Sequence, residues 1–265
     1  MKKKIGTILL LCVGAICAIS IYGNTTDTPK HELISKEDFY YQEIKDSKNT
    51  FKQLTRLAQQ QLASVVSSDE HILIPATFTR QEHPLTCEIA SLRMALNVFQ
   101  HDVTEEDLLY KLKFDVQTPR TSKNIWGDPD KGFVGDVDGS VRHGTGYGTY
   151  DTPIRDVALY YRNAERLQKA TLSGIITEIE SGNPVIVWGL LASKNPLYWK
   201  TKHDKTVEAF YGEHARVLIG YTGTKSNPQE MILMDPLYGK IKMNTDRFVQ
   251  EWKELNNRAV VVYKN

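Results

Sequence analysis

The spacing of the apolar residues changes near residue 184, and this change limits the possible folds more than any other feature of the chain. Before it, apolar residues such as Leu92, Leu96 and Phe99 recur three and four positions apart, which predicts helices. After it come short β-prone apolar runs at 185–191, 215–221, 231–234 and 259–263. Helices followed by strands indicate an α+β fold with an antiparallel sheet in the second half.

The N-terminus has the features of an export segment. Three lysines precede residues 5–22, which include no charged residue. As a helix, this run would measure roughly 27 Å, close to the thickness of a bilayer core. Its length favours a retained signal anchor, whereas the small residues Ala18 and Ser20 favour cleavage, so we expect residues 1–23 to be one or the other. In both cases the lysines stay cytoplasmic, and the rest of the chain is predicted to be extracytoplasmic.

Composition excludes several classes of protein once this segment is set apart. Hydrophobic residues make up 41% of the chain and charged residues 25%, as in a folded globular protein. Of the 33 basic residues, the three terminal lysines account for three, which leaves 30 against 32 acidic residues, and no nucleic-acid partner is predicted. Cys12 and Cys17 lie in the export segment. Cys87 is therefore alone in the body, which rules out a disulfide scaffold.

The body divides into two predicted regions. Residues 24–69 are predicted to form a polar linker followed by a helical extension, and residues 70–265 are predicted to form one folded domain. Within the domain we expect a helix over 87–99, and a second one to about residue 112 that begins with a capping box of Thr104 and Asp107. Thr152 and Pro153 are expected to cap and open a third helix, and further helices are predicted over 172–181 and 245–255.

The chemistry centres on Cys87, which begins the helix predicted over 87–99. A helix N-terminus favours negative charge, so it stabilises a thiolate, which is a candidate nucleophile. Gln81 lies six residues upstream. Its amide, together with the backbone N–H of Cys87, would form an oxyanion hole.

A nucleophilic thiol needs a proton shuttle, and His214 is the best placed histidine because it opens the strand predicted at 215–221. It follows Cys87 by 127 residues. Asp235 comes 21 residues later, at the end of the next predicted strand. If a hairpin joins these strands, the start of the first lies beside the end of the second, so Asp235 would reach and orient His214.

These residues resemble the C39-like cysteine peptidases of the papain-like fold, and the resemblance covers roughly residues 70–263. It rests on the residues above and on the segments 87–92, 126–129, 132–136, 146–148, 182–188, 212–215 and 234–239. The resemblance implies that Cys87 is the nucleophile, His214 the general acid and base, and Asp235 the residue that orients it. It also implies that Gln81 is the oxyanion donor and that no cofactor is needed. Glu88 departs from it, because papain-like relatives usually carry glycine after the nucleophile.

A glycine-rich segment and several possible metal ligands complete the sequence pattern. Residues 126–150 contain seven glycines and are predicted to form one wall of the substrate cleft, with Trp126, Phe133 and Tyr147 as contacts. No metal is expected. His83 lies four residues before Cys87, but no second metal-binding motif supports zinc. The aspartates at 128, 130, 136 and 138 miss the spacing of a calcium loop.

The sequence therefore predicts an exported or membrane-anchored bacterial cysteine peptidase or amidase that acts on a peptide or protein substrate. Two alternatives remain open. One is a catalytically silent papain-fold module that binds peptides, which Glu88 keeps in consideration. The other is a transpeptidase or isopeptidase of the cell envelope, because the same thioester can pass to an amine or to water.

Overall fold

The computed structural model describes residues 49–50, 52–57, 71–191 and 195–264. Contacts divide the chain into two units, Met1–Ala58 and Gln59–Asn265. In the first unit, residues 49, 50 and 52–57 are helical, as predicted for this part of the extension. The predicted export segment and the linker lie outside the described residues. Within the described ranges, no helix is long and apolar enough to cross a membrane.

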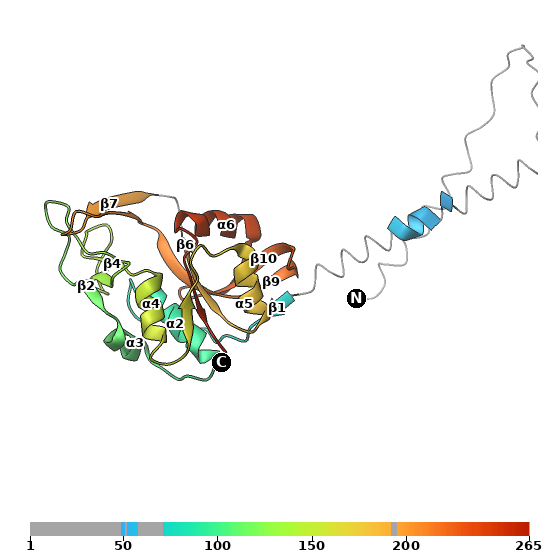
Figure 1. Ribbon diagram of the computed structural model, residues 1–265, viewed down its shortest axis with the longest axis horizontal. Helices are drawn as coiled ribbons and strands as arrows, with labels where there is room; N and C mark the ends of the chain where they lie inside the picture. The colour runs from blue at the N-terminus through green and yellow to red at the C-terminus, as the bar shows by residue number, and fades with distance from the viewer. Residues whose placement is uncertain (1–48, 51, 58–70, 192–194, 265) are drawn as a thin grey trace, which may run out of the picture. The chain divides into compact units, whose positions relative to one another are not determined.

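An antiparallel sheet forms the centre of the second unit (Figure 1). Its strands, in spatial order, are β11 (Gly239–Asn244), β10 (Asn227–Asp235), β9 (Glu213–Thr224), β6 (Val185–Leu190), β12 (Ala259–Val262) and β5 (Ala164–Arg166). A short strand, β1 (His71–Leu73), also pairs with β9. Every one of these pairings is antiparallel, which confirms the sheet predicted for the second half of the chain.

Helices cover both faces of this sheet. All six residues of β6 are buried, and since successive side chains point to opposite faces, neither face meets water there. Helix α2 (Cys87–Asn97) packs against β9 and β6, and α6 (Thr245–Glu254) packs against β6, β10 and β11. Figure 1 shows α6 above the strands and α2 below them. Helix α5 (Leu172–Glu180) contacts β9, and α3 (Glu105–Lys111) contacts α2.

The structure confirms the helices predicted for the domain, with one exception. The capping box is present, because the Thr104 hydroxyl accepts from the Asp107 N–H and the Asp107 carboxylate accepts from the Thr104 N–H. The prediction for α4 (Asp151–Ala158) was wrong, since the helix begins at Asp151 and not after Thr152. The Asp151 carboxylate is held by Arg166 and Arg258, and a proline is tolerated throughout a first turn whose N–H groups lack intrahelical partners.

Two small sheets stand apart from the central one, and the sequence pattern predicted neither. One contains β2 (Phe114–Val116), β3 (Phe133–Gly135) and β4 (Gly146–Gly148). The other is a ribbon of β7 (Pro196–Lys200) and β8 (Thr206–Phe210), which Figure 1 shows reaching away from the sheet. Trp199 of β7 is buried against Trp126 and Tyr147, so the ribbon is fixed to the glycine-rich segment.

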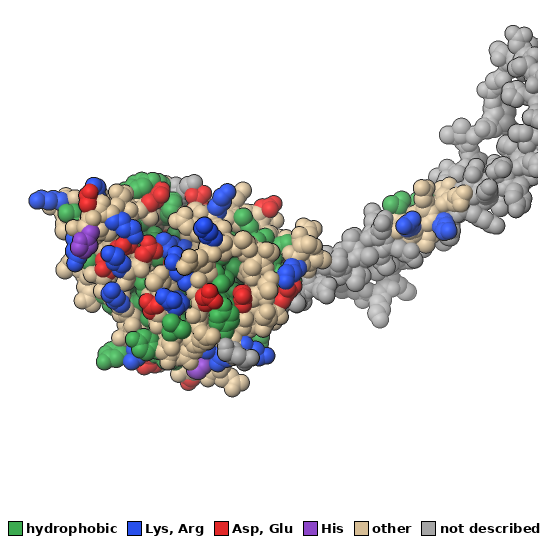
Figure 2. Space-filling model, in the orientation of Figure 1, with side chains coloured by type: hydrophobic (Ala, Val, Ile, Leu, Met, Phe, Trp, Pro, Cys, Tyr) green, Lys and Arg blue, Asp and Glu red, His purple; other side chains and the backbone are tan. Residues whose placement is uncertain are grey.

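The surface of this unit mixes charges of both signs. On the face shown in Figure 2, Lys and Arg side chains alternate with Asp and Glu side chains rather than gathering in one patch. This distribution agrees with the near-neutral formal charge of the chain.

Candidate active site

Cys87 is the first residue of α2, and its free thiol is buried with 6% of the residue exposed. Two neighbours contact the sulfur. The backbone N–H of Ala215 on β9 donates to Sγ at 3.4 Å, and Sγ lies 3.3 Å from Oε2 of Glu88. The packing of α2 on β9 therefore brings the predicted nucleophile to the strand that carries His214.

His214 and Asp235 meet where β9 begins and β10 ends, as the predicted hairpin requires. Nε2 of His214 lies 3.0 Å from both carboxylate oxygens of Asp235, and both residues are buried. Asp235 also accepts from Nε of Arg216 at 2.9 Å and from the N–H of Leu237 at 2.8 Å. Because Asp235 occupies Nε2, Nδ1 is the ring nitrogen left to exchange a proton with a thiol.

Burial controls the protonation of this pair. It lowers the pKa of His214, and although the Asp235 contact raises that pKa, the net direction is down. Burial also acts to raise the pKa of Asp235, but the hydrogen bonds from His214, Leu237 and Arg216 outweigh it and lower the pKa to about 2. Asp235 is therefore an anion throughout the physiological pH range, beside an imidazole that is mostly neutral.

The thiol itself is not poised as a thiolate in this state. Burial raises the pKa of Cys87, and the nearby carboxyl groups of Glu88 and Glu213 raise it further. The sequence suggested that the helix N-terminus would favour the thiolate, whereas burial and the two carboxyl groups act in the opposite direction, and the net direction of the Cys87 pKa is up. These directions favour a neutral thiol and a neutral imidazole at the same cavity.

Gln81 lines the cavity that also reaches Cys87 and His214, but its amide nitrogen faces the loop that follows it. Nε2 donates to the carbonyl oxygens of His83 at 2.8 Å and Pro84 at 3.0 Å. Its Oε1 atom is buried without a hydrogen-bond partner among the described residues. To donate to an oxyanion, the amide would have to release these two carbonyls, so the structure brings Gln81 to the site in another orientation.

Two glutamates flank the thiol, Glu88 fully buried and Glu213 half-buried, and the sequence pointed only to the first. Oε1 of Glu88 accepts from the N–H of Thr149 at 2.7 Å, while burial raises the pKa of Glu88 to about 7. Glu213 precedes His214 on β9, and burial raises its pKa as well. Single ligand atoms of Cys87, Glu88 and Glu213 all lie within 4.8 Å of one another. Adjacency to His214 was the only sequence signal for Glu213.

The predicted substrate contacts lie in three different places. Tyr147 lines a cavity of about 170 Å³ that also reaches Cys87, His214 and Gln81. Phe133 is fully buried against Phe114 and lines no described cavity at the thiol. The other apolar and small residues that line this cavity were not predicted as substrate contacts. They are Pro84, Leu85, Val141, Leu191, Phe210, Tyr211, Gly212 and Leu237.

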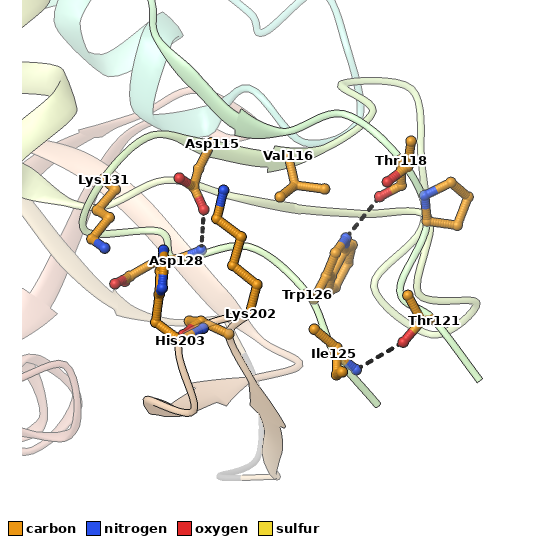
Figure 3. A pocket seen from close by; sticks show the side chains of 12 residues that line it. Asp115, Val116, Thr118, Thr121, Ile125, Trp126, Asp128, Lys131, Lys202 and His203 are labelled. Atoms are coloured by element: carbon orange, nitrogen blue, oxygen red, sulfur yellow. Dashed lines mark hydrogen bonds between the residues drawn. The ribbon is translucent and has the colours of Figure 1, made fainter. Parts of the chain in front are cut away.

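Trp126 lines a separate cavity of about 290 Å³ (Figure 3). Its Nε1 donates to the carbonyl of Thr118 at 2.9 Å, which fixes the ring on the cavity wall. Asp115 and Asp128 face the same cavity, and the Asp115 carboxylate accepts from the Asp128 N–H at 2.8 Å. Lys202 and His203 complete this wall in Figure 3.

The possible metal ligands weighed from the sequence have other partners. Nδ1 of His83 lies 2.9 Å from Oδ1 of Asp138. Asp128 pairs with Lys205 at 2.9 Å, and Asp130 lies 3.2 Å from that lysine. His83, Asp138, Asp128 and Asp130 thus form ion pairs with other side chains of the protein.

Comparisons with known proteins agree with this architecture. The model of the Peptidase_C39 like family matches residues 73–260. The uncharacterised protein YvpB of Bacillus subtilis (strain 168) is 34% identical over 188 residues, which cover 67% of this chain and 69% of YvpB. A crystal structure from Bacillus anthracis, assigned as a C39-like peptidase, superimposes with a TM-score of 0.64 at 25% identity. That likeness covers 74% of this chain and 99% of the other.

Proposed function

Because the chain belongs to the Peptidase_C39-like family, whose fold is papain-like, we propose that it is a cysteine peptidase or amidase that works by acyl transfer through Cys87, His214 and Asp235. The observation that carries the proposal is the buried contact of His214 with Asp235 at the same cavity as the Cys87 thiol. In this proposal Asp235 holds the ring, so that Nδ1 faces the nucleophile.

Two steps make up the reaction. Nδ1 of His214 accepts the Cys87 proton as Sγ attacks the carbonyl carbon of the substrate, and the oxyanion accepts from the Cys87 N–H at the helix N-terminus. The C–N bond then breaks, and the leaving amine takes the proton from His214. In the second step water gives a proton to His214 and attacks the thioester. The C–S bond then breaks, Sγ takes that proton from His214, and the acid and the free thiol are released.

The lining of the cavity supports a peptide substrate with an apolar side chain near the scissile bond. Leu85, Val141 and Phe210 contribute apolar surface next to Cys87. Tyr147 is held there by a hydrogen bond between its hydroxyl and that of Tyr150 at 2.9 Å. Of the three substrate contacts predicted from the sequence, Tyr147 is the one that contacts the substrate in this proposal.

A peptide library incubated with the full chain, in the presence of a chelator, tests the proposal. Cleavage that disappears in Cys87→Ala and falls by roughly a thousandfold or more in His214→Ala would support it. Labelling of Cys87 with a thiol reagent gives a second measurement. If His214→Ala leaves the labelling rate of Cys87 unchanged, His214 does not activate the thiol.

The neutral thiol beside two carboxyl groups favours a second candidate, a peptide-binding module without turnover. Tight peptide binding that survives Cys87→Ala, with no cleavage by the wild type, would establish it. A transpeptidase or isopeptidase forms the same thioester, and an added amine that appears in the product would reveal it.

We also propose that the body acts outside the cytoplasm, on the basis of the charge and hydropathy of residues 1–23. Protease accessibility of the body in intact cells checks this expectation. A body that is degraded only after the cells are lysed would contradict it.

A further inference from the structure

We propose that Cys87, Glu88 and Glu213 form a binding site for one Zn²⁺ ion, and that the ion, when bound, withholds the thiol from reaction. The consequence for reactivity rests on the proposed function, whereas the site itself does not. One sulfur and one oxygen from each carboxyl group lie within 4.8 Å of one another. These atoms come from the N-terminus of α2 and the start of β9, two elements that pack together in the core.

An unsatisfied atom points to a missing ligand at this place. Oε1 of Glu213 is buried and has no hydrogen-bond partner among the described residues. Glu213 as a whole is half-buried at the wall of the cavity, and a carboxyl oxygen of it lies within 4.8 Å of one of Glu88. Buried polar groups in native structures are nearly always paired, and buried charges are paired or coordinate metals. A cation between the two carboxylates would supply the missing partner.

The donor set selects the ion. Ca²⁺ and Mg²⁺ bind oxygen ligands and do not favour sulfur, whereas Zn²⁺ binds thiolate and carboxylate together. In a tetrahedral zinc site with bonds of about 2.3 Å to sulfur and about 2.0 Å to oxygen, neighbouring ligand atoms lie roughly 3.5 Å apart. The distances between the three ligand atoms are at most 4.8 Å, so each needs to shorten by no more than about an ångström for the ion to bind.

The surroundings hold the ligands in place and leave room for the ion. The Thr149 N–H binds Oε1 of Glu88 and directs the other oxygen toward Cys87, as the outer partners of metal ligands commonly do. At Gly148, an added Cβ would lie 2.5 Å from Oε1 of Glu88 and 3.5 Å from Oε2 of Glu213. The glycine therefore keeps this side of the cluster open. The cavity that reaches Cys87 and Glu213 gives the ion a way in.

Binding removes the nucleophile by a simple exchange. Zn²⁺ forms a bond to Sγ as the thiol proton leaves to solvent, and any proton on the carboxyl groups of Glu88 and Glu213 leaves as well. One thiolate and two carboxylates then surround the ion, and the site carries one net negative charge. The sulfur lone pair that would attack a carbonyl is then engaged with the metal. A chelator that takes the ion returns the thiol. His214 keeps its contact with Asp235 and is not a ligand in this proposal.

The experiment measures alkylation of Cys87 by iodoacetamide in the full chain, with added Zn²⁺ or with a chelator. Mass spectrometry of the peptide that contains Cys87 excludes signal from Cys12 and Cys17. We expect Zn²⁺ to slow alkylation of the wild type by at least about tenfold, and Glu213→Gln to lose most of this protection. The matched control is Glu106→Gln, the same change at an exposed position of α3, which is expected to behave as the wild type.

Co²⁺ in place of Zn²⁺ gives a readout that does not depend on reactivity. A thiolate–cobalt charge-transfer band in the near ultraviolet is expected for the wild type, and it should be absent in Cys87→Ala and weakened in Glu213→Gln. A thermal melt in the presence of chelator shows whether Glu213→Gln is folded. If Glu213→Gln is not folded, Glu88→Gln, which removes the other carboxylate, takes its place in both measurements.

Equal zinc protection in the wild type and in folded Glu213→Gln would overturn the proposal, and so would a wild-type alkylation rate that Zn²⁺ does not change. Neither readout needs a substrate. A protein that binds zinc at Cys87 and cleaves no peptide contradicts only the proposed peptidase. A protein that cleaves peptides but ignores Zn²⁺ contradicts only the metal site.

Discussion

At the residue scale, Glu88 is the side chain with the largest direct influence on the proposed nucleophile. It is fully buried, and its Oε2 atom lies 3.3 Å from Sγ of Cys87. A carboxylate at this distance favours the thiol over the thiolate. The departure from the resemblance at this position is therefore a chemical difference at the site, since the side chain points toward the sulfur and not away from it.

Replacing Glu88 by glutamine should make Cys87 more reactive. The amide fills the same space without the negative charge, so the pKa of Cys87 falls, and a fall of one unit is about a tenfold gain in thiolate. We expect alkylation of Cys87 at pH 8, with chelator present, to accelerate severalfold in Glu88→Gln and to stay unchanged in Glu106→Gln. A slower reaction in Glu88→Gln would indicate that Glu88 assists the thiol.

The ionisation of Asp235 should appear in the acid stability of the fold. Its pKa is lowered to about 2 in the folded state from an ordinary value near 3.8. A depressed pKa stabilises the fold above the ordinary value, and this contribution is lost as the pH falls through about 2. Its size is about 2 kcal/mol. We expect wild type and Asp235→Asn to differ in unfolding free energy at pH 5 by at least this much.

Denaturant unfolding between pH 5 and pH 2 measures this difference. It should shrink by about 2 kcal/mol over the interval, because Asp235 becomes protonated in the unfolded wild type and half protonated in the folded one, while the asparagine does not titrate. A difference that stays constant down to pH 2 would show that the carboxylate is not stabilised by His214, Leu237 and Arg216.

At the element scale, the hairpin of β9 and β10 assembles the proposed catalytic pair, and Arg216 secures it. Arg216 is buried, donates to Asp235 and to the carbonyl of Leu190, and lies 3.4 Å from Glu251 on α6. It therefore links both strands to the helix above them. The sequence predicted that the two strand ends would meet, but nothing in its pattern singled out this arginine.

Arg216→Met should destabilise the protein by roughly 3 kcal/mol, because it leaves the buried Asp235 carboxylate with one charged partner fewer. The matched control is Arg247→Met. Arg247 also pairs with Glu251, but its side chain is 64% exposed, so the expected loss is below about 1 kcal/mol. Chemical denaturation compares the two. Equal losses would show that Arg216 contributes no more than a surface charge.

The predicted and observed elements differ where sequence periodicity was weakest. The helix at Cys87 and the strands β6, β9, β10 and β12 were predicted within a few residues of their ends. The strands β2 to β5 contain three residues each, too few to establish a period. The strand β7 was not predicted, although its buried residues Leu197 and Trp199 alternate with exposed ones. The segment is short and starts at a proline, so its strand signal is weak.

At the scale of the whole molecule, the described apolar core lies in the second unit. Its buried residues run from Ile74 to Val262, and the central sheet contributes most of its strands to it. Among the described residues of the first unit, Met1–Ala58, none belongs to this core. The core lies within residues 59–265, so we expect this part of the chain to fold as a domain by itself.

A fragment of residues 59–265 should fold without the rest of the chain. We expect its thermal midpoint to lie within a few degrees of that of the full chain, with the same rate of Cys87 alkylation in the presence of chelator. Calorimetry and peptide mass spectrometry make the two measurements. A fragment that aggregates or melts much lower would show that residues 1–58 stabilise the domain.

The sequence by itself determined the fold class and the order in which the candidate site residues follow one another along the chain. Local periodicity and capping are properties of neighbouring residues, so they predicted the helix that begins at Cys87 and the hairpin that brings His214 to Asp235. Only the tertiary structure decided the electrostatics of the thiol. Burial and the approach of Glu213 depend on the packing of α2 against β9, two elements more than a hundred residues apart, and no local pattern records that contact.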